Sequence, residues 1–545
     1  MRVKLRRGIC EGAVAATALA GQLQLETTAP THKWLVAIAV MLGTVLEVLD
    51  NSIINVALPH LQGTFSASVD EIAWVLTSYL VANGIMIPMS GWISSRFGRK
   101  RYFLTSVFTF VAASALCGAA QSLDQMVAFR LIQGAAGAAM IPSSQAILME
   151  TFPPTQQQMA MAVWGMGLMV APIAGPTLGG WITDNWNWRW NFYINLPLGS
   201  LAFLMVYTFV HDPPFMHERR TRGGKVDYAG ILLLVLSIGL LQLVLDRGQR
   251  ADWFESPWVV LATAFSALCF ILLVARELTF SEPILDLRIF KERTFVVSVI
   301  LTIAMSFTLF GSILLNPLFL QELLGYSAWK TGLVQAPLGL CSGTSMLMTG
   351  QLARLGLNTR PLVGLGFALV ALGAWRMSGM NLQVSMLAVL KRNLTMSFGF
   401  GMIFPNTSAA ALSCVSRERI GYAASLFNML RNTGAAIGIA FMTNSLISHQ
   451  QLHQSHLVEH FSIFDAWRFG RTMPPGAAQA FAYLPQLGHG SSHSLAMVYG
   501  LVRQQAMMLA FNDIYRTIAI ALIPLIPLFL FLPSSKSSPG GPASH

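Results

Sequence analysis

WLVAIAVMLGTVLEVLDNSIINVAL, residues 34–58, is the stretch that decides the fold class of this chain. Roughly 20 apolar residues in an α-helix span the ~30 Å hydrocarbon core of a bilayer, so this run predicts a transmembrane helix. Glu47 and Asp50 interrupt it one helical turn apart. An ionised carboxylate within a membrane is costly unless it is paired or hydrated, and such residues generally carry function.

Composition extends this interpretation to the whole chain. Of its 545 residues 54% are hydrophobic and only 11% are charged, and the mean hydropathy is +0.57. These values predict an all-α polytopic membrane protein in a lipid bilayer. The net charge of +11 is not arranged as a basic stripe interleaved with aromatic residues, so no nucleic-acid partner is expected. The five cysteines show neither a disulfide framework nor metal-ligand spacing.

Apolar runs of sufficient length occur fourteen times along the chain. We place the predicted spans at 34–58, 72–95, 102–121, 125–150, 158–182, 190–210, 227–246, 257–276, 294–320, 329–351, 360–379, 384–412, 420–447 and 508–532.

Basic residues predict which side of the membrane each loop faces. They cluster in alternate loops, at 96–101, 219–225 and 276–293. Because cytoplasmic loops carry an excess of Lys and Arg, both termini are expected in the cytoplasm of a cell whose inner (plasma) membrane holds the protein. The start imitates a secretory signal, but Glu11 breaks its short apolar core, so residues 1–33 are interpreted as an uncleaved cytoplasmic tail and 534–545 as a second tail.

An internal repeat divides the chain into two halves. RLIQGAAGAAMIPSSQAILME (130–150) and RNLTMSFGFGMIFPNTSAAALS (392–413) each begin with an Arg followed by small residues and a Pro. Repeated halves with a site between them are typical of secondary transporters that work by alternating access. The predicted domains are a six-helix bundle at 34–210, linker segments with two inserted helices at 211–293, and a second six-helix bundle at 294–533.

Five motifs resemble one known family: LDNSIINVALP (49–59), GWISSRFGRKR (91–101), FRLIQG (129–134), GPTLGG (175–180) and WRWNFYINLPLG (188–199). On these residues the chain resembles the fourteen-helix drug:proton antiporters of the major facilitator superfamily, of EmrB/QacA type. The resemblance covers nearly all of the chain. It implies the major facilitator fold and a proton-coupled antiporter that exports hydrophobic or amphipathic drugs and toxic compounds. Its energy would come from a proton gradient, without a cofactor or a bound metal.

The resemblance also assigns residues to conformational gating. In the loop motif the family usually has an acidic residue where this chain has Ser95, so a charge relay through that position cannot be transferred. Ala171 replaces a glycine of the antiporter motif, a change that still allows close helix packing. The predicted gating residues are Gly91, Arg96, Gly98, Arg99, Gly175, Pro176, Gly179 and Gly180.

The proton-coupling prediction combines the family motif with the chemistry of buried carboxylates. We expect Asp50 to carry the proton, since two nearby carboxylates cannot easily both ionise. Arg130 is the expected countercharge, because an intramembrane guanidinium needs a partner. Glu47 is expected to share this role; the alternative is that Glu47 faces a hydrated vestibule and only Asp50 titrates. The substrate cavity is predicted to include Asn51, Arg392, Asn428 and Arg431.

The region 448–507 is the longest polar segment and is predicted to form a periplasmic loop. Its start, HQQLHQSHLVEH (449–460), is interpreted as a solvated amphipathic helix rather than a metal site, and 494–516 has a helical pattern. In Gram-negative relatives a long outer loop accompanies docking on a periplasmic adaptor (membrane fusion protein) and an outer-membrane channel, so both partners are expected.

Two alternatives to drug export stay open at this point. The same fold could export a specific native metabolite, siderophore or fatty acid, which a narrow substrate range would reveal. A non-transporting membrane sensor would be insensitive to loss of Asp50. An enzyme is not expected, because the sequence has no nucleophile elbow, metal-ligand motif or nucleotide-binding loop.

Overall fold

The structure analysed is a computed structural model that describes residues 32–212, 226–280, 283–459 and 492–533. Within these ranges every regular element is a helix, which confirms the predicted all-α class. Each of the fourteen predicted spans coincides with helical residues. Nine helices in the described ranges are long and apolar enough to cross a membrane, or up to ten if the bent pair Met386–Ser413 and Arg417–Glu459 counts as one span. Nearly all of the predicted N-terminal tail, the predicted C-terminal tail and the basic cluster at 219–225 lie outside the described residues.

The first half of the chain supplies seven main helices. These are α2 (Lys33–Phe65), α4 (Trp74–Phe97), α5 (Arg99–Ala119), α6 (Leu123–Gly137), α7 (Met140–Thr151), α8 (Pro154–Asn185) and α10 (Asn195–Phe209). The short helices α3 (Val69–Ile72) and α9 (Trp190–Tyr193) precede α4 and α10. The predicted fourth span is therefore made of α6 and α7 together.

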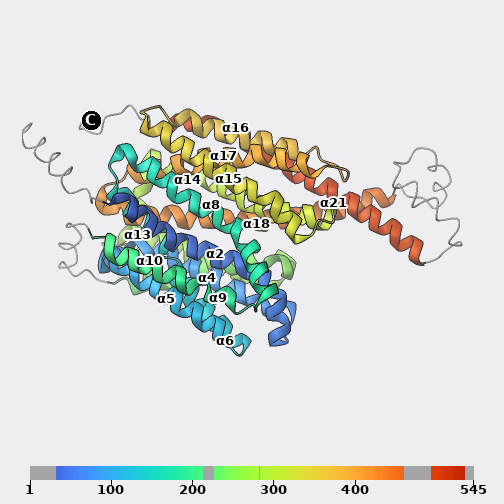
Figure 1. Ribbon diagram of the computed structural model, residues 1–545, viewed down its shortest axis with the longest axis horizontal. Helices are drawn as coiled ribbons and strands as arrows, with labels where there is room; N and C mark the ends of the chain where they lie inside the picture. The colour runs from blue at the N-terminus through green and yellow to red at the C-terminus, as the bar shows by residue number, and fades with distance from the viewer. Residues whose placement is uncertain (1–31, 213–225, 281–282, 460–491, 534–545) are drawn as a thin grey trace, which may run out of the picture.

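The second half follows the inserted pair α12 (Tyr228–Arg247) and α13 (Pro257–Thr279). Its helices are α14 (Arg293–Leu318), α15 (Ala328–Arg354), α16 (Arg360–Met377), α17 (Met386–Ser413), α18 (Ile420–Glu459) and α21 (Ser492–Leu522), which continues as a 3₁₀ helix at Ile523–Phe531. Figure 1 shows most of these helices running along the long axis, with α14 to α17 on one side and α2, α4, α5 and α10 on the other. The helix α8 joins the two groups by packing against both α2 and α15.

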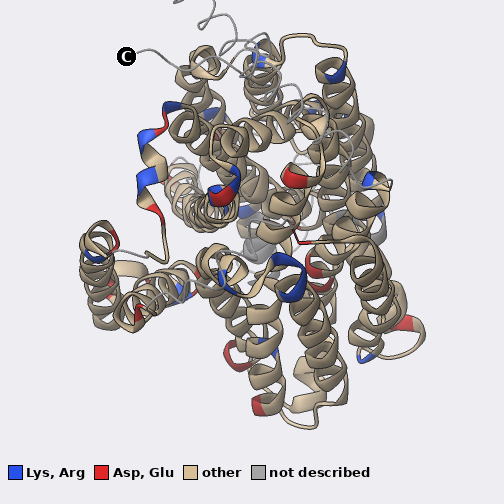
Figure 2. Cartoon of the chain, turned by 90° about the vertical axis from the view of Figure 1, so that its left-hand side faces the viewer, with Lys and Arg blue, Asp and Glu red and all other residues tan. Residues whose placement is uncertain are grey.

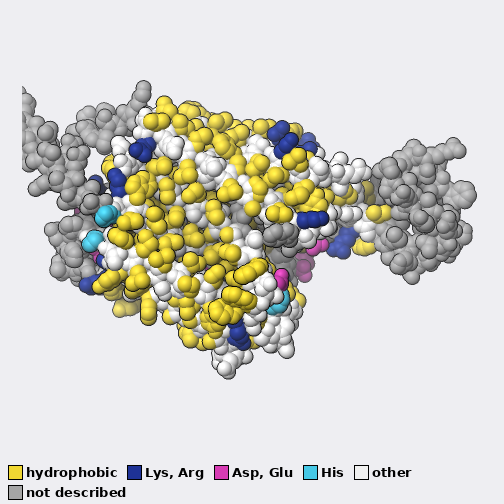
Figure 3. Space-filling view, in the orientation of Figure 1, with side chains coloured by type: hydrophobic (Ala, Val, Ile, Leu, Met, Phe, Trp, Pro, Cys, Tyr) yellow, Lys and Arg dark blue, Asp and Glu magenta, His cyan; other side chains and the backbone are white. Residues whose placement is uncertain are grey.

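The surface carries the broad apolar belt that a bilayer requires. Figure 3 shows hydrophobic side chains over most of the face in view, with charged side chains toward the ends of the helices. Figure 2 views the molecule from one end and shows most of the ribbon in the colour of uncharged residues. The described elements form a multi-pass membrane protein, because such a belt is stable against lipid and costly in water.

The inserted pair is attached to the first half through α4. The hydroxyl of Thr77 donates to the carboxylate of Asp246, and the Arg247 guanidinium lies 4.5 Å from the centre of the Trp74 ring. The helix α12 also contacts α18. The pair therefore covers the side of the bundle where α4 and α18 meet.

Beyond the bundle, α18 and α21 continue side by side as a projecting arm (Figure 1). His453 Nε2 lies 2.6 Å from Asp513 Oδ2, and Gln454 donates to the Tyr499 hydroxyl at 3.1 Å. Much of the predicted loop 448–507 is thus helical, as the pattern at 494–516 predicts. Residues 460–491, including His460, lie outside the described residues. In the ranges that are described, no group of three or more His, Cys, Asp or Glu is placed to hold a metal ion.

Candidate functional site

Asp50 on α2 is at the centre of a buried hydrogen-bonded cluster. Its Oδ2 lies 2.6 Å from Arg130 Nη1, and its Oδ1 accepts hydrogen bonds from Gln133 Nε2 at 3.0 Å and Asn195 Nδ2 at 2.5 Å. Asp50 is 1% exposed and Arg130 is fully buried. The structure thus places Arg130, the predicted countercharge, next to Asp50. It adds Gln133 and Asn195 as neutral hydrogen-bond donors. Asp50 is therefore surrounded by one cationic and two neutral hydrogen-bond donors.

The partners of Asp50 are themselves held in place. Asn195 also donates to Ser114 at 2.9 Å, whose hydroxyl donates to the Phe192 carbonyl. Arg130 donates through Nε to the Val75 carbonyl at 3.3 Å and lies 4.7 Å from the centre of the Tyr79 ring. Supporting contacts of this kind fix the orientation of a functional group. They connect α2 with α4, α5, α6 and α10.

Glu47 occupies a different environment from Asp50, although both belong to α2. Its Oε1 accepts a hydrogen bond from Asn83 Nδ2 at 3.0 Å, while its buried Oε2 has no hydrogen-bond partner among the residues that the structure describes. Glu47 is 5% exposed. Glu47 and Asp50 therefore have separate hydrogen-bond donors.

The glycines of α8 pack against α2 beside the Asp50 cluster. A Cβ on Gly179 would lie 3.0 Å from the side chain of Ile53 and 3.1 Å from its carbonyl oxygen. A Cβ on Gly175 would clash with the side chain of Ser52. A Cβ on Gly180 would lie 3.7 Å from the Val56 side chain, which is an ordinary contact. Pro176 lies inside the helix. The absence of side chains at Gly175 and Gly179 allows α8 and α2 to pack closely.

The loop motif of 91–101 closes one end of the interface between the halves. A Cβ on Gly91 would lie 2.7 Å from the Gly421 carbonyl oxygen and 2.8 Å from Tyr422 Cα, so only glycine allows α4 and α18 to approach this closely. Ser95, at the family's acidic position, lies 3.1 Å from the Tyr422 hydroxyl. A neutral hydrogen bond therefore links the halves here.

The turn that follows is fixed by Gly98 and Arg99. Gly98 has φ 93°, a conformation that favours glycine, and it lets α5 begin directly after α4. The Arg99 guanidinium pairs with Glu150 of α7 at 2.5 Å, with both side chains buried. Arg96 instead points to the Trp92 ring, 5.5 Å from its centre. The motif thus anchors the α4–α5 turn to α7.

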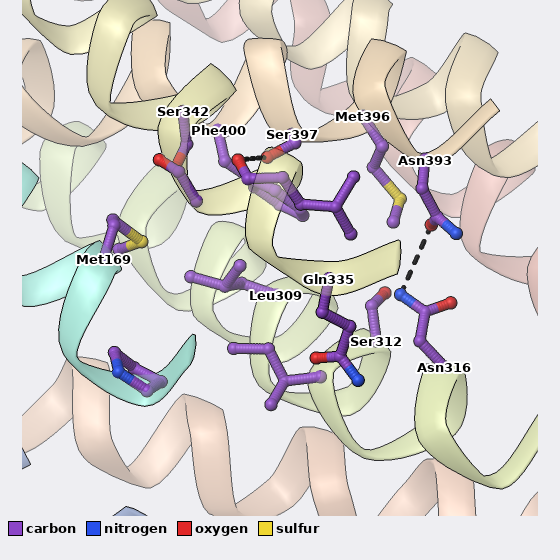
Figure 4. A pocket seen from close by; sticks show the side chains of 14 residues that line it. Met169, Leu309, Ser312, Asn316, Gln335, Ser342, Asn393, Met396, Ser397 and Phe400 are labelled. Carbon is purple, nitrogen blue, oxygen red and sulfur yellow. Dashed lines mark hydrogen bonds between the residues drawn. The ribbon is translucent and has the colours of Figure 1, made fainter. Parts of the chain in front are cut away.

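A cavity of about 80 Å³ lies between α8, α14, α15 and α17. Figure 4 shows apolar side chains such as Met169, Leu309 and Phe400 facing it together with uncharged polar ones. The polar members are Ser312, Asn316, Gln335, Ser342, Asn393 and Ser397. Asn316 donates to Asn393 at 3.3 Å. Such a lining suits a hydrophobic ligand with a few hydrogen-bonding groups.

The structure places the four residues predicted for the substrate cavity in separate environments. Asn51 is partly exposed on α2, and Arg392 donates to the carbonyl oxygens of Arg376 at 2.9 Å and Gly379 at 3.3 Å. Asn428 is fully buried at the boundary between the halves, where its Nδ2 donates to Gln145 Oε1 at 2.5 Å. Arg431 is 6% exposed on α18. None of them lines the cavity in Figure 4.

Sequence reasoning missed the neutral partners of the two carboxylates. Gln133 lies three residues after Arg130, a spacing that places both on one helix face and could have revealed it. Asn195 lies within the motif WRWNFYINLPLG (188–199), which could have revealed it, whereas Asn83 comes from a distant helix and gives no comparable signal. The residues of the cavity in Figure 4 were also missed, because Ser, Asn and Gln in apolar runs are common in packed helices.

Comparison with known proteins agrees with this architecture. The family model described as Major Facilitator Superfamily matches residues 40–439. The multidrug export protein EmrB of Escherichia coli strain K12 is 34% identical over 514 residues, covering 94% of this chain and 98% of that protein. The fatty acid resistance protein FarB of Neisseria gonorrhoeae is 32% identical over 509 residues, covering 93% of this chain and 97% of its own length.

A solved structure supports the fold independently of close sequence similarity. The human organic anion transporter MFSD10 superposes with a TM-score of 0.56 at 16% identity, covering 90% of this chain and 99% of that one. At this identity the likeness shows the fold alone. Together with the family match and the similarity to EmrB, it shows that the chain belongs to the major facilitator superfamily, among its multidrug efflux transporters of the EmrB type.

Proposed function

We propose that this efflux transporter is a secondary active, proton-coupled antiporter. It exports hydrophobic or amphipathic drugs and toxic compounds by alternating access, with Asp50 as the proton carrier and no cofactor. The observation that carries the proposal is the buried cluster of Asp50 with Arg130, Gln133 and Asn195.

The cluster suggests how a proton and a conformational change are coupled. While Arg130 and the two amides face Asp50, its carboxylate oxygens are occupied by these three donors. When Arg130 withdraws, a buried unpaired carboxylate becomes costly, and protonation restores neutrality. Because α8 packs on α2 through Gly175 and Gly179, a shift of α2 on protonation also moves the helix that joins the halves.

Substrate-triggered proton movement tests this mechanism. Proteoliposomes containing a pH-sensitive dye are compared for wild type, Asp50→Asn and Glu47→Gln while lipophilic cations and anions are added. We expect proton release from wild type and none from Asp50→Asn, since an amide cannot bind and release a proton as a carboxylate can. The Glu47→Gln variant decides whether one carboxylate or two do the coupling. Equal proton release from wild type and Asp50→Asn would show that the proposed carrier is wrong.

The proposal includes the inner membrane, with both termini in the cytoplasm, because the predicted basic loops alternate along the chain. With this orientation the arm of α18 and α21 projects into the periplasm. A periplasmic adaptor and an outer-membrane channel are the proposed partners there. Co-purification of a tagged adaptor with wild type, and its loss when the projecting arm is shortened, tests the partnership.

A second candidate function is export of fatty acids. The similarity to FarB, whose name denotes fatty acid resistance, favours it over other specific cargoes. A multidrug exporter is expected to respond to compounds of unrelated structure in the proteoliposome assay. A response confined to fatty acids would instead support the second function.

A further inference from the structure

The first and last main helices of the first half, α2 and α10, pack directly against each other. Asn195 of α10 donates to Asp50 of α2 at 2.5 Å, and a Cβ on Gly199 would lie 3.3 Å from the Leu46 side chain. The first and last helices of the second half, α14 and α21, are arranged differently.

The helices α14 and α21 are joined at two places along their length. The Tyr515 hydroxyl donates to Asn316 Oδ1 at 2.9 Å. Further along, the 3₁₀ helix Ile523–Phe531, which continues α21, packs against α14. Pro524 and Pro527 lack the backbone donors that an α-helix needs, so the α-helix ends before them. Between the two joints the helices border a groove of about 380 Å³.

The lining of this groove is apolar. The hydroxyl of Thr308, which belongs to the lining, donates to the Ala304 carbonyl at 2.9 Å. Ile300 is 40% exposed, so the groove reaches the surface of the bundle. The main apolar lining residues are Ile300, Ile303, Phe307, Ile518, Leu522 and Leu525. Such a lining disfavours a charged or polar group and suits a hydrocarbon chain.

The groove lies where hydrocarbon chains are available. Both of its walls belong to candidate membrane spans, Arg293–Leu323 and Tyr499–Phe531, which lipid chains surround in a bilayer. A volume of about 380 Å³ holds about a dozen methylene groups, each roughly as large as a water molecule at ~30 Å³. The groove therefore has room for a large part of one acyl chain.

Basic side chains lie at the end of α14 below the groove. Arg293 precedes Ile300 by seven residues, which is two helical turns or about 10 Å, so both lie on one face of α14. Lys291 comes just before the helix. Both basic side chains are exposed, and neither forms an ion pair within the described part of the chain. One leaflet of hydrocarbon is about 15 Å deep, so a lipid with its head at Arg293 reaches the groove with its chain.

We propose that the groove between α14 and α21 binds an acyl chain of an anionic phospholipid, whose phosphate group is held by Arg293 and Lys291. The chain fills the space that direct helix packing fills between α2 and α10. Basic residues at the membrane surface attract anionic headgroups, which selects this lipid over a zwitterionic one. The proposal goes beyond the exporter function and does not depend on which compound is exported.

Two lipids with the same chains and different headgroups test the site. Binding of dioleoylphosphatidylglycerol and dioleoylphosphatidylcholine to the full chain in detergent is measured by native mass spectrometry. Loss of one basic side chain near an anionic headgroup predicts about fivefold weaker phosphatidylglycerol binding in Arg293→Gln. Phosphatidylcholine binding should change by less than about twofold, because its headgroup carries no net charge. Arg101→Gln, exposed on α5 in the other half, is the matched control and should change neither lipid.

Two further variants test the chain and the charge separately. Ala304→Trp fills the groove and should weaken the binding of both lipids, because their chains are the same. Ala112→Trp, at an exposed position of α5, is its control and should change neither. Glu292→Gln removes the negative charge next to Arg293 and should strengthen phosphatidylglycerol binding, the opposite sign. Glu292 and Arg293 are exposed, so their variants keep the test decisive if Ala304→Trp does not fold.

Three results would overturn the proposal. Equal weakening of both lipids by Arg293→Gln would show that the basic residues do not recognise the headgroup. Glycerol 3-phosphate binding as tightly as phosphatidylglycerol would show that the chain does not occupy the groove. If Ala304→Trp leaves phosphatidylglycerol binding unchanged but slows the proton release that lipophilic cations trigger, the groove admits substrate instead of lipid.

Discussion

Gly91 of α4 lies against the backbone of α18, so a larger side chain at this position should push the two helices apart. Replacing Gly91 by Ala places a Cβ 2.7 Å from the Gly421 carbonyl oxygen and 2.8 Å from Tyr422 Cα. Both are backbone atoms, so no side chain can rotate away. Since ordinary contacts begin at 3.4 Å, α4 and α18 must separate by about 0.7 Å at this point.

In the alternating-access cycle that we propose, the cost of that separation falls on only one conformational state. Overpacking of a close contact costs roughly 1–3 kcal/mol, which corresponds to a shift of about 5- to 150-fold in a two-state equilibrium. The state in which α4 and α18 touch is the one that is destabilised. Gly91→Ala should therefore favour the state in which this end of the bundle is open.

Distances between spin labels at Phe97 and Ser416 measure this opening. Both residues are exposed at the same end of the bundle, one in each half. Gly84→Ala is the matched control, because it lies on the same helix and its Cβ would only touch Gln242 at 3.7 Å. Both substitutions share the helix-propensity gain of alanine, which cancels in the comparison. A distance distribution for Gly91→Ala that matches both wild type and Gly84→Ala would refute the reasoning.

Three further predictions concern the links between helices. Glu150→Ala leaves the buried Arg99 guanidinium unpaired and should lower the free energy of unfolding by about 3–5 kcal/mol, measured by thermal unfolding in detergent. An effect below about 1 kcal/mol would contradict the buried pair. Arg250→Ala breaks only an exposed pair and should cost less than about 1 kcal/mol in the same experiment; a larger loss would show that this contact holds the inserted helices. Tyr422→Phe removes the hydrogen bond to Ser95, worth about 0.5–1.5 kcal/mol, so the label distances should change less than in Gly91→Ala. A larger change in Tyr422→Phe would mean that the hydrogen bond, rather than glycine packing, closes this end.

Local sequence patterns predicted the elements of this protein because the bilayer constrains them strongly. A spanning segment must bury its own backbone hydrogen bonds, so long apolar runs predict helices, and all fourteen predicted spans are helical. Asp50 and Arg130 were predicted for the site because charged residues within apolar runs are costly. Their pairing at 2.6 Å follows from the way the helices pack.

What the sequence by itself determined was the class of membrane protein, its helices and its charged intramembrane residues. Only the tertiary structure decided which neutral side chains form hydrogen bonds with those charged residues. Asn195 donates to Asp50 across 145 positions of the chain, and Asn428 donates to Gln145 across 283. The tertiary structure also gives Glu47 and Asp50 different hydrogen-bond donors, although the two residues lie only one helical turn apart on α2. Periodicity places residues on a face of their own helix, but the neighbours of that face depend on how the other helices pack.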